Sequence, residues 1–517
     1  MAFSLDPLSV NTPSLATPSP IKFSRMLFLA LAGACLPLSL APFDWWWLGV
    51  LVMAALVAGL DRSSAKHSFF LGWIFGSASF LTGVSWVYIA IHDFGATPAY
   101  LALPMTAIFC IFLGIVPALF CYAYSRWVRD GRGGRILGFA AMWVLCEWLR
   151  GWIFTGFPWL YLGYSQLNTP LSGWSPVVGV YGLSFWVALS GAALAQFLIA
   201  PNKTKLSSAA PLLACALLFG QGYLLKQTEW TQAKDVAPLR IGAVQSNISQ
   251  EKKWAYTQYW ATLELYDQAS EKLWADADLV IWPEAAIPAL YHNAQSFFDY
   301  IAERAAANDS ALITGVPTRF DENMYNSAMV ISGGEGIYHK QRLVPFGEYV
   351  PLGQYIHGLL KIFDLPLSSF SRGGAEQSHL AVKGWELAPS ICYEIAYPDL
   401  IAQSARGSDV LFTISNDAWF GHSIGPDQHM QMAQMRALEN GRELIRVTST
   451  GITALVDHQG NIRSRVPSFT ETALRGEVHA REGSTPFTRY GSTPIILLCF
   501  ALILAARIKP RQSPRPS

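Results

Sequence analysis

Most of the first 225 residues form long apolar segments that are separated by short polar connections. A helix that crosses a lipid bilayer needs about 20 apolar residues, within a range of about 17–25. These segments predict an integral membrane bundle of about eight helical spans, the last of which follows a long polar region. The predicted spans cover residues 26–42, 45–60, 69–91, 98–124, 135–154, 174–200, 208–225 and 493–507.

The composition agrees with a membrane protein and argues against several other classes. Only 14% of the 517 residues are charged, whereas soluble domains contain about 25%. The net charge of +1 gives no reason to expect a nucleic acid partner. The seven cysteines form no close pairs, so the sequence indicates neither a disulfide framework nor a zinc site.

Basic residues are concentrated in alternate connections between the predicted spans. These connections and the C-terminal tail contain Lys22, Arg25, Arg62, Lys66, Arg126, Arg129, Arg132, Arg135, Lys203, Lys205, Arg507, Lys509, Arg511 and Arg515. The opposite short loops are nearly free of Lys and Arg, so the positive-inside rule places both termini in the cytoplasm. The polar region follows the seventh span and is therefore expected on the far side of the membrane. The predicted organisation is a disordered tail (1–23), a seven-span bundle (24–226), an extramembrane domain (227–490) and a final span with a basic tail (491–517).

The polar region has the pattern of a layered α/β domain. Short apolar runs such as DLVIWPE and DVLFTISND alternate with helical patterns such as AQSFFDYIAERAAA. The region has no phosphate-binding glycine loop, GxSxG turn or HExxH helix. His422 and His429 are interpreted as ordinary surface or turn residues rather than metal ligands, and no cofactor is predicted.

Three polar side chains stand out in the polar region. Glu284 ends DLVIWPE, Lys340 lies on a predicted hairpin strand, and Cys392 ends WELAPSIC as the only cysteine outside the apolar segments. Each has an ordinary alternative: a solvated loop carboxylate, a surface lysine and a packed thiol. The apolar neighbours of Glu284 are expected to raise its pKa toward the range of a general base. Glu348 lies in an apolar stretch and therefore needs a charged partner.

Together, the motifs WPE (282–284), HKQRLVPFGEYVP (339–351) and SICYEIAYPD (390–399) resemble, in order, those of the nitrilase (carbon–nitrogen hydrolase) superfamily. The resemblance covers about residues 230–480. With the flanking spans, the chain resembles the apolipoprotein N-acyltransferases, membrane-bound members of that superfamily. The resemblance implies an α-β-β-α sandwich for the extramembrane domain.

The resemblance also implies roles for individual residues. Cys392 would be the nucleophile, Glu284 the general base and Lys340 the cation that stabilises the oxyanion. Supporting roles would fall to Glu348, Tyr393 and Glu394. Residues near the substrate would be Trp254, Asn326 and Trp419, with Ser415 and Asn416 in the loop of Trp419. Trp159 is also expected to bind substrate, as part of a lipid-facing floor, because its segment is predicted on the non-cytoplasmic side.

The implied reaction is a two-step acyl transfer at the bacterial inner membrane, with the catalytic domain in the periplasm. A phospholipid, expected to be phosphatidylethanolamine, would acylate the cysteine. The α-amine of a diacylglyceryl apolipoprotein would then accept the acyl group. The apolar segment 355–370 is expected either to be a mobile arm that admits acyl chains or to be a buried insertion.

Two other functions fit parts of the sequence. A membrane-tethered nitrilase-type amidase would hydrolyse a small carbon–nitrogen substrate, but a single span would suffice to anchor it. A non-catalytic scaffold would require the three motifs to coincide in order by chance. Detection of a fatty-acyl adduct on Cys392 separates the acyltransferase from both.

Overall fold

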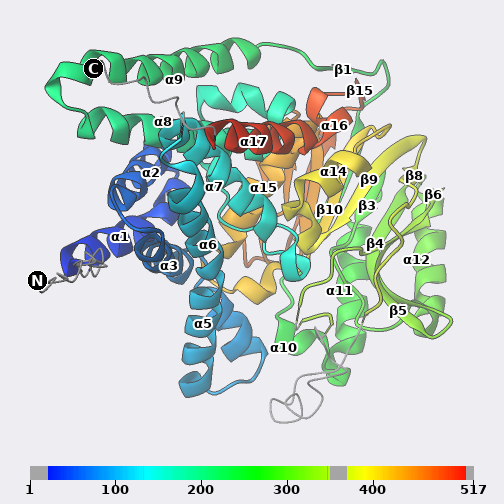
Figure 1. The fold of residues 1–517 in the computed structure, drawn as a ribbon. Helices are drawn as coiled ribbons and strands as arrows, with labels where there is room; N and C mark the ends of the chain where they lie inside the picture. The colour runs from blue at the N-terminus through cyan, green and yellow to red at the C-terminus, as the bar shows by residue number, and fades with distance from the viewer. Residues whose placement is uncertain (1–20, 132, 346, 350–369, 508–517) are drawn as a thin grey trace, which may run out of the picture.

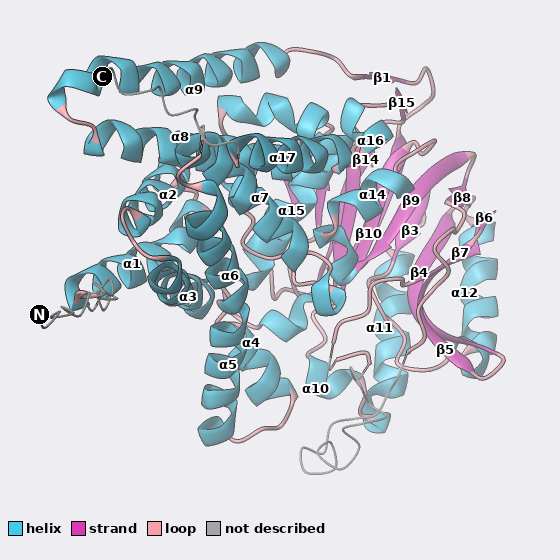
Figure 2. Ribbon diagram, viewed as in Figure 1, coloured by secondary structure: helices cyan, strands magenta, loops and turns pink. Residues whose placement is uncertain are grey.

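The computed structural model describes residues 21–131, 133–345, 347–349 and 370–507, so most of the predicted N-terminal tail lies outside the described residues. A helical bundle lies on one side of the molecule and an α/β domain on the other (Figures 1 and 2). The C-terminal helix returns from the α/β domain to the bundle (Figure 1). The two kinds of sequence pattern therefore form two adjoining parts.

Each predicted span contains a helix, although several are short or bent. The main helices of the bundle are α1 (Phe23–Cys35), α2 (Trp46–Leu60), α3 (Ala65–Gly83), α4 (Val87–Ile89), α5 (Ala99–Leu113), α6 (Ile115–Ala123), α7 (Phe139–Arg150), α8 (Ser175–Ile199), α9 (Lys205–Leu225) and α17 (Thr493–Ala506). Within the described part of the chain, three stretches are long and apolar enough to cross a membrane: 99–128, 170–199 and 205–225. A fourth is added if α3 and the segment after it, which meet at 65°, form one span. The helix lengths therefore support three or four of the eight predicted spans.

Close helix contacts in the bundle depend on small residues. A Cβ at Gly33 of α1 would lie 2.2 Å from the carbonyl oxygen of Phe75 in α3. A Cβ at Gly76 of α3 would lie 3.1 Å from the Cα of Gly114, between α5 and α6. Because lipid tails are as apolar as the side chains, helices in a membrane associate largely through such close packing.

The α/β domain contains two main sheets. The first has the order β14-β2-β3-β4-β5-β7, with bounds Thr472–Val478, Leu239–Gln245, Leu279–Ile281, Ala311–Phe320, Asn323–Ser332 and Ile337–His339. The second has the order β13-β12-β11-β10-β9-β8-β6, with bounds Ile462–Arg465, Ala454–Val456, Leu444–Thr448, Val410–Ser415, Trp385–Ile391, Leu380–Val382 and Gly334–Glu335. A short antiparallel pair, β1 (Thr231–Ala233) and β15 (Arg481–Gly483), joins the two ends of the domain.

The two sheets face each other and helices cover their outer faces. Ile281 of β3 and Phe412 of β10 belong to one buried apolar cluster between the sheets. Val280, the neighbour of Ile281, belongs instead to a cluster with helices α11 (Tyr259–Glu271) and α12 (Gln295–Ala307). This alternation follows from the two-residue repeat of a strand. Helices α14 (Pro398–Ser404) and α15 (Gly425–Asn440) cover the second sheet, which completes an α-β-β-α arrangement. Two shorter helices are α10 (Gln250–Lys253) and α16 (Pro486–Tyr490).

The side of the domain where α15 covers the second sheet packs directly against the bundle. Met435 and Leu438 of α15 share a buried apolar cluster with bundle residues. The hydroxyl groups of Tyr393 and Tyr397 donate to the carbonyl oxygens of Gly156 and Thr155, at 3.0 and 2.9 Å. The loop after α7 is thus fixed to the segment that carries Cys392.

Candidate active site

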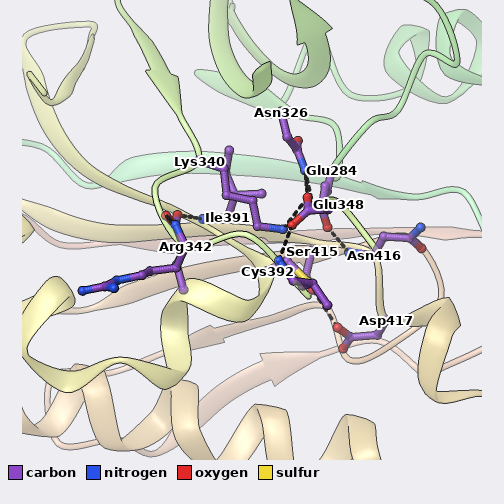
Figure 3. Close-up of polar contacts among 12 residues, drawn as sticks. Glu284, Asn326, Lys340, Arg342, Glu348, Ile391, Cys392, Ser415, Asn416 and Asp417 are labelled. Carbon is purple, nitrogen blue, oxygen red and sulfur yellow. Dashed lines mark hydrogen bonds and ion pairs between the residues drawn. The ribbon is translucent and has the colours of Figure 1, made fainter. Parts of the chain in front are cut away.

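Residues from the three sequence motifs lie together at one end of the sheets (Figure 3). Glu284 follows β3, Lys340 follows β7 and Cys392 follows β9. Lys340 Nζ lies 3.1 Å from Glu284 Oε1, although the two residues are 56 positions apart in the chain. Strand ends of the two facing sheets therefore bring the base, the cation and the thiol of the sequence prediction into one site.

Glu284 is held by hydrogen bonds to both carboxylate oxygens. Oε1 accepts from Asn326 Nδ2 at 2.7 Å in addition to Lys340, and Oε2 accepts from the backbone N–H of Asn416 at 2.8 Å. Its backbone packs against Gly315 of β4, where a Cβ would lie 2.6 Å from the Cα of Glu284. The carboxylate is therefore held by the side chains of Asn326 and Lys340 and by the backbone N–H of Asn416, which follows β10 of the second sheet.

Lys340 is buried between two carboxylates. Its side chain is 1% exposed, and Nζ lies 2.9 Å from Glu348 Oε1. Glu348 in turn accepts from Asn326 Nδ2 at 2.8 Å and from the backbone N–H of Val344 at 2.8 Å. The structure thus supplies the charged partner that the apolar surroundings of Glu348 require, and Asn326 bridges the two carboxylates.

The charges of this cluster reinforce one another. Burial raises the pKa of Glu284, but Lys340, Asn326 and Lys253 outweigh burial and hold the pKa below its ordinary value. The expectation of a raised pKa is therefore wrong, because the sequence around Glu284 does not show the cations that reach it. Burial lowers the pKa of Lys340, but Glu284 and Glu348 outweigh burial and hold the pKa well above its ordinary value. Both groups are ionised at neutral pH.

Cys392 begins the short 3₁₀ helix η11 (Cys392–Ala396) with a backbone φ of +53°. Such a conformation costs about 1–3 kcal/mol in a residue other than glycine and occurs often at active sites. Burial and the Glu284 carboxylate together raise the pKa of the thiol to about 12, although Lys340 opposes them. The resting thiol is therefore protonated, and a base has to accept its proton when the sulfur reacts.

A buried cluster supports the backbone of Cys392. His429 Nε2–H donates to the carbonyl oxygen of Cys392 at 3.1 Å. His429 Nδ1 lies 3.0 Å from Asp417 Oδ1, and Arg446 donates to Asp417 Oδ2 at 2.7 Å. The interpretation of His429 as a surface residue is wrong, because α15 is enclosed by the second sheet and the bundle and His429 is fully buried. Among the described residues, no group of His, Cys, Asp and Glu could hold a metal ion.

Glu394 and Tyr393 connect Cys392 to its surroundings. Glu394 is fully buried and accepts backbone N–H groups of Ile391, Gln341 and Arg342 at 2.8, 2.6 and 3.0 Å. Burial raises the pKa of this carboxyl to about 7. The segment after Lys340 is thereby joined to the segment of Cys392, while Tyr393 joins the latter to the bundle.

The predicted substrate-binding residues occupy different environments. Asn326 lies in the site, and Trp254 is 52% exposed at the end of α10. Trp419 lies in the loop after β10 with its ring 5.6 Å from that of Phe94 in the bundle. Trp159 does not face lipid: it is 1% exposed, stacks on Tyr393 and donates to Gln428 Oε1 at 2.8 Å. The apolar segment predicted at 355–370 lies, apart from Phe370, outside the described residues.

Sequence reasoning missed a buried lysine at this site. Lys253 is 4% exposed and its Nζ donates to the backbone carbonyl oxygen of Glu284 at 2.9 Å. It follows Lys252 in a short polar run, QEKK, which is typical of a solvated helix end. Nothing in that run distinguishes a buried lysine from a surface one.

Comparison with known proteins agrees with this architecture over nearly the whole chain. Residues 32–193 match the model of the apolipoprotein N-acyltransferase N-terminal domain, and residues 240–486 match that of carbon–nitrogen hydrolases. An apolipoprotein N-acyltransferase of Azotobacter vinelandii is 44% identical over 95% of this chain and 97% of its own length. Those of Pseudomonas paraeruginosa and Vibrio parahaemolyticus are 44% and 37% identical, each over 94% of this chain and 97% of its own. A solved carbon–nitrogen hydrolase superfamily protein from Xanthomonas campestris aligns with 51% of this chain and 97% of its own, at 18% identity and a TM-score of 0.37. With both family models matched in order and relatives of this identity along its length, the chain belongs to the apolipoprotein N-acyltransferase family.

Proposed function

We propose that this protein transfers a fatty acyl group from a phospholipid to the α-amine of the N-terminal diacylglyceryl cysteine of an apolipoprotein, through a thioester on Cys392. The buried cluster of Glu284, Lys340 and Glu348 beside Cys392 is the observation that carries the proposal. It supplies an ionised base and a cation next to a thiol that cannot react unaided.

In the first half-reaction, Cys392 attacks the ester carbonyl carbon of the phospholipid, expected to be the sn-1 ester of phosphatidylethanolamine. Glu284 accepts the thiol proton as the carbon–sulfur bond forms, and Lys340 stabilises the negative charge that develops on the carbonyl oxygen. The carbon–oxygen bond then breaks, and the proton on Glu284 passes to the leaving glycerol oxygen. A lysophospholipid leaves and the acyl group remains on sulfur.

In the second half-reaction, the neutral α-amine of the lipidated cysteine attacks the thioester carbonyl carbon. Glu284 accepts a proton from the attacking nitrogen and returns it to the sulfur of Cys392 as the carbon–sulfur bond breaks. The products are an amide and the free thiol. Water would hydrolyse the same thioester, so the low exposure of Glu284 and Lys340, at 6% and 1%, favours transfer over hydrolysis.

The proposed placement follows from the substrates, since both are anchored in lipid. The bundle (24–226) and the final helix (within 491–517) would lie in the bacterial inner membrane, with the catalytic domain (227–490) on the periplasmic side and both termini in the cytoplasm. The basic residues of alternate connections support this orientation. The packing of α15 against the bundle would hold the site near the membrane surface.

Mass spectrometry of the purified full chain tests the proposal. After incubation with phosphatidylethanolamine in mixed micelles, we expect a fatty-acyl adduct on Cys392 that is absent from Cys392→Ala. A synthetic diacylglyceryl cysteine peptide should then remove the adduct and become N-acylated. A folded protein that forms no adduct overturns the proposal. Discharge by water at the same rate without the peptide, together with hydrolysis of small amides, would favour the amidase instead.

A further inference from the structure

Negative charge exceeds positive charge among the groups that contact Lys340. This one ammonium group pairs with two carboxylates, Glu284 at 3.1 Å and Glu348 at 2.9 Å. The cluster therefore carries one negative charge in excess before any reaction begins. The attack of Cys392 adds negative charge at the sulfur and then at the carbonyl oxygen of the substrate. An excess negative charge opposes both changes, and the opposition is strong because the site is buried.

The Asp417 cluster and Glu394, which also lie near Cys392, do not compensate for this excess negative charge. Asp417 is paired with Arg446 and contacts His429, so that cluster contains its own counter-charge. Glu394 is a further carboxyl group, and its hydrogen bonds come from backbone N–H groups and a tyrosine hydroxyl.

Lys253 reaches the site through the backbone of Glu284. It is 4% exposed at the end of α10, and Nζ donates to the backbone carbonyl oxygen of Glu284 at 2.9 Å. Helix α10 is itself fixed, since Gln250 Oε1 accepts from Asn416 Nδ2 at 2.7 Å, and the backbone N–H of Asn416 donates to the Glu284 carboxylate. Burial lowers the pKa of Lys253 to about 8, against the opposing charges of Glu284 and Cys392. It therefore remains mostly charged at neutral pH.

The same contact fixes the backbone of the loop that carries Glu284. Ala285, the next residue, has a φ of +46°, which a residue other than glycine adopts only under constraint. The backbone N–H of Ala286 donates to the carbonyl oxygen of Gly315 at 2.8 Å, which holds the far side of the turn. Lys253 holds the other side of the turn, because it binds the carbonyl oxygen of Glu284, the residue before Ala285.

We propose that Lys253 is a second cation of the reaction centre, a positioning residue that offsets the charge of Glu348 and fixes the backbone of Glu284. The inference rests on the proposed function, because it concerns the same thiol and base. It assigns the two lysines separate tasks: Lys340 pairs with both carboxylates, and Lys253 balances the charge from the backbone carbonyl oxygen of Glu284.

The pH dependence of Cys392 alkylation tests this inference without any lipid substrate. Iodoacetamide reacts with the thiolate, and peptide mass spectrometry follows Cys392 in the full chain in detergent. In Lys253→Met, we expect the pH–rate profile to move by about one unit to higher pH, so that the rate on its rising limb falls about tenfold. Lys253→Arg, which keeps the charge, should stay within about threefold of the wild type. Lys272→Met, at an exposed lysine of the same domain, should leave the profile unchanged.

A second variant separates charge balance from structural damage. If Lys253 offsets Glu348, then Lys253→Met combined with Glu348→Gln should bring the profile back toward the wild type, because one charge of each sign has been removed. A purely structural role predicts a double variant at least as impaired as Lys253→Met. Gel filtration and thermal unfolding of each variant monitor the fold.

The outcomes distinguish this inference from the proposed function. Lys340→Met serves as the benchmark, since Lys340 contacts both carboxylates. If Lys340→Met moves the profile and Lys253→Met does not, or if the double variant shows no recovery, the role of Lys253 is overturned and the site remains. If phospholipid leaves no acyl adduct on the wild-type thiol, the proposed function fails whatever the alkylation profiles show.

Discussion

Gly315 of β4 provides a direct test of how closely the Glu284 loop must be held. In Gly315→Ala, the new Cβ would lie 2.6 Å from both the Cα of Glu284 and the carbonyl oxygen of Pro283, and 2.8 Å from the backbone nitrogen of Ala285. All three atoms belong to the backbone, so no side-chain rotation relieves the contact. An ordinary contact of 3.4 Å requires a displacement of about 0.8 Å. A misplacement of about 1 Å in a catalytic group can cost about a hundredfold in rate.

We therefore expect Gly315→Ala to form the Cys392 acyl adduct about a hundredfold more slowly than the wild type. Overpacking of this kind also costs about 1–3 kcal/mol in the free energy of unfolding. Time-resolved intact-protein mass spectrometry measures the first effect, and thermal unfolding in detergent measures the second. Gly374→Ala is the matched control, because its nearest contact would be an ordinary 3.7 Å to the carbonyl oxygen of Glu376. Acylation of folded Gly315→Ala at the wild-type rate would refute the reasoning.

Three further changes test other contacts of the site. Glu394→Gln replaces an acceptor oxygen by an N–H₂ group that faces backbone donors, so we expect unfolding to require about 1–3 kcal/mol less; an unchanged thermal midpoint contradicts this. His429→Phe keeps a ring but removes the donor to the carbonyl oxygen of Cys392, so adduct formation should slow while the protein still folds, and a normal rate means that the hydrogen bond does not position the thiol. Because the pKa of Glu284 is lowered on folding, its ionisation stabilises the protein above the ordinary carboxyl pKa of about 4.3, and the benefit disappears as pH falls through the lower folded-state value. Wild type should therefore be more stable than Glu284→Gln at pH 7, with the difference shrinking below about pH 4 in thermal unfolding measured against pH.

Local patterns predicted the architecture of the catalytic domain well. In DLVIWPE, apolar residues occupy both faces of the strand, and the structure places Ile281 between the sheets and Val280 under the helices. The strand patterns placed Glu284 and Cys392 at strand ends and Lys340 on a hairpin strand, and the fold brings the three residues together. The sequence showed less of the bundle, because the lengths of apolar segments do not reveal where helices break, as α3 does after Gly83.

Long-range contacts account for what the sequence did not predict. The low pKa of Glu284 depends on Lys340 and Lys253, which are distant in the chain or unremarkable in their local pattern. The burial of His429 and Trp159 depends on the contact between bundle and domain, which neither segment encodes alone. Single-sequence patterns report which face of an element is apolar, and they do not report what covers that face.

The bonds from Tyr393 and Tyr397 to the loop at Thr155 and Gly156 have a consequence for how this protein can change over evolutionary time. The residue next to Cys392 is bonded to a bundle loop about 240 positions earlier in the chain, so an insertion or deletion in that loop is expected to disturb the backbone of Cys392. A change in the loop is therefore expected to be tolerated only with a matching change around the two tyrosines. A chimera that joins this bundle to the domain of a distant relative should require the loop and the tyrosines to be exchanged together.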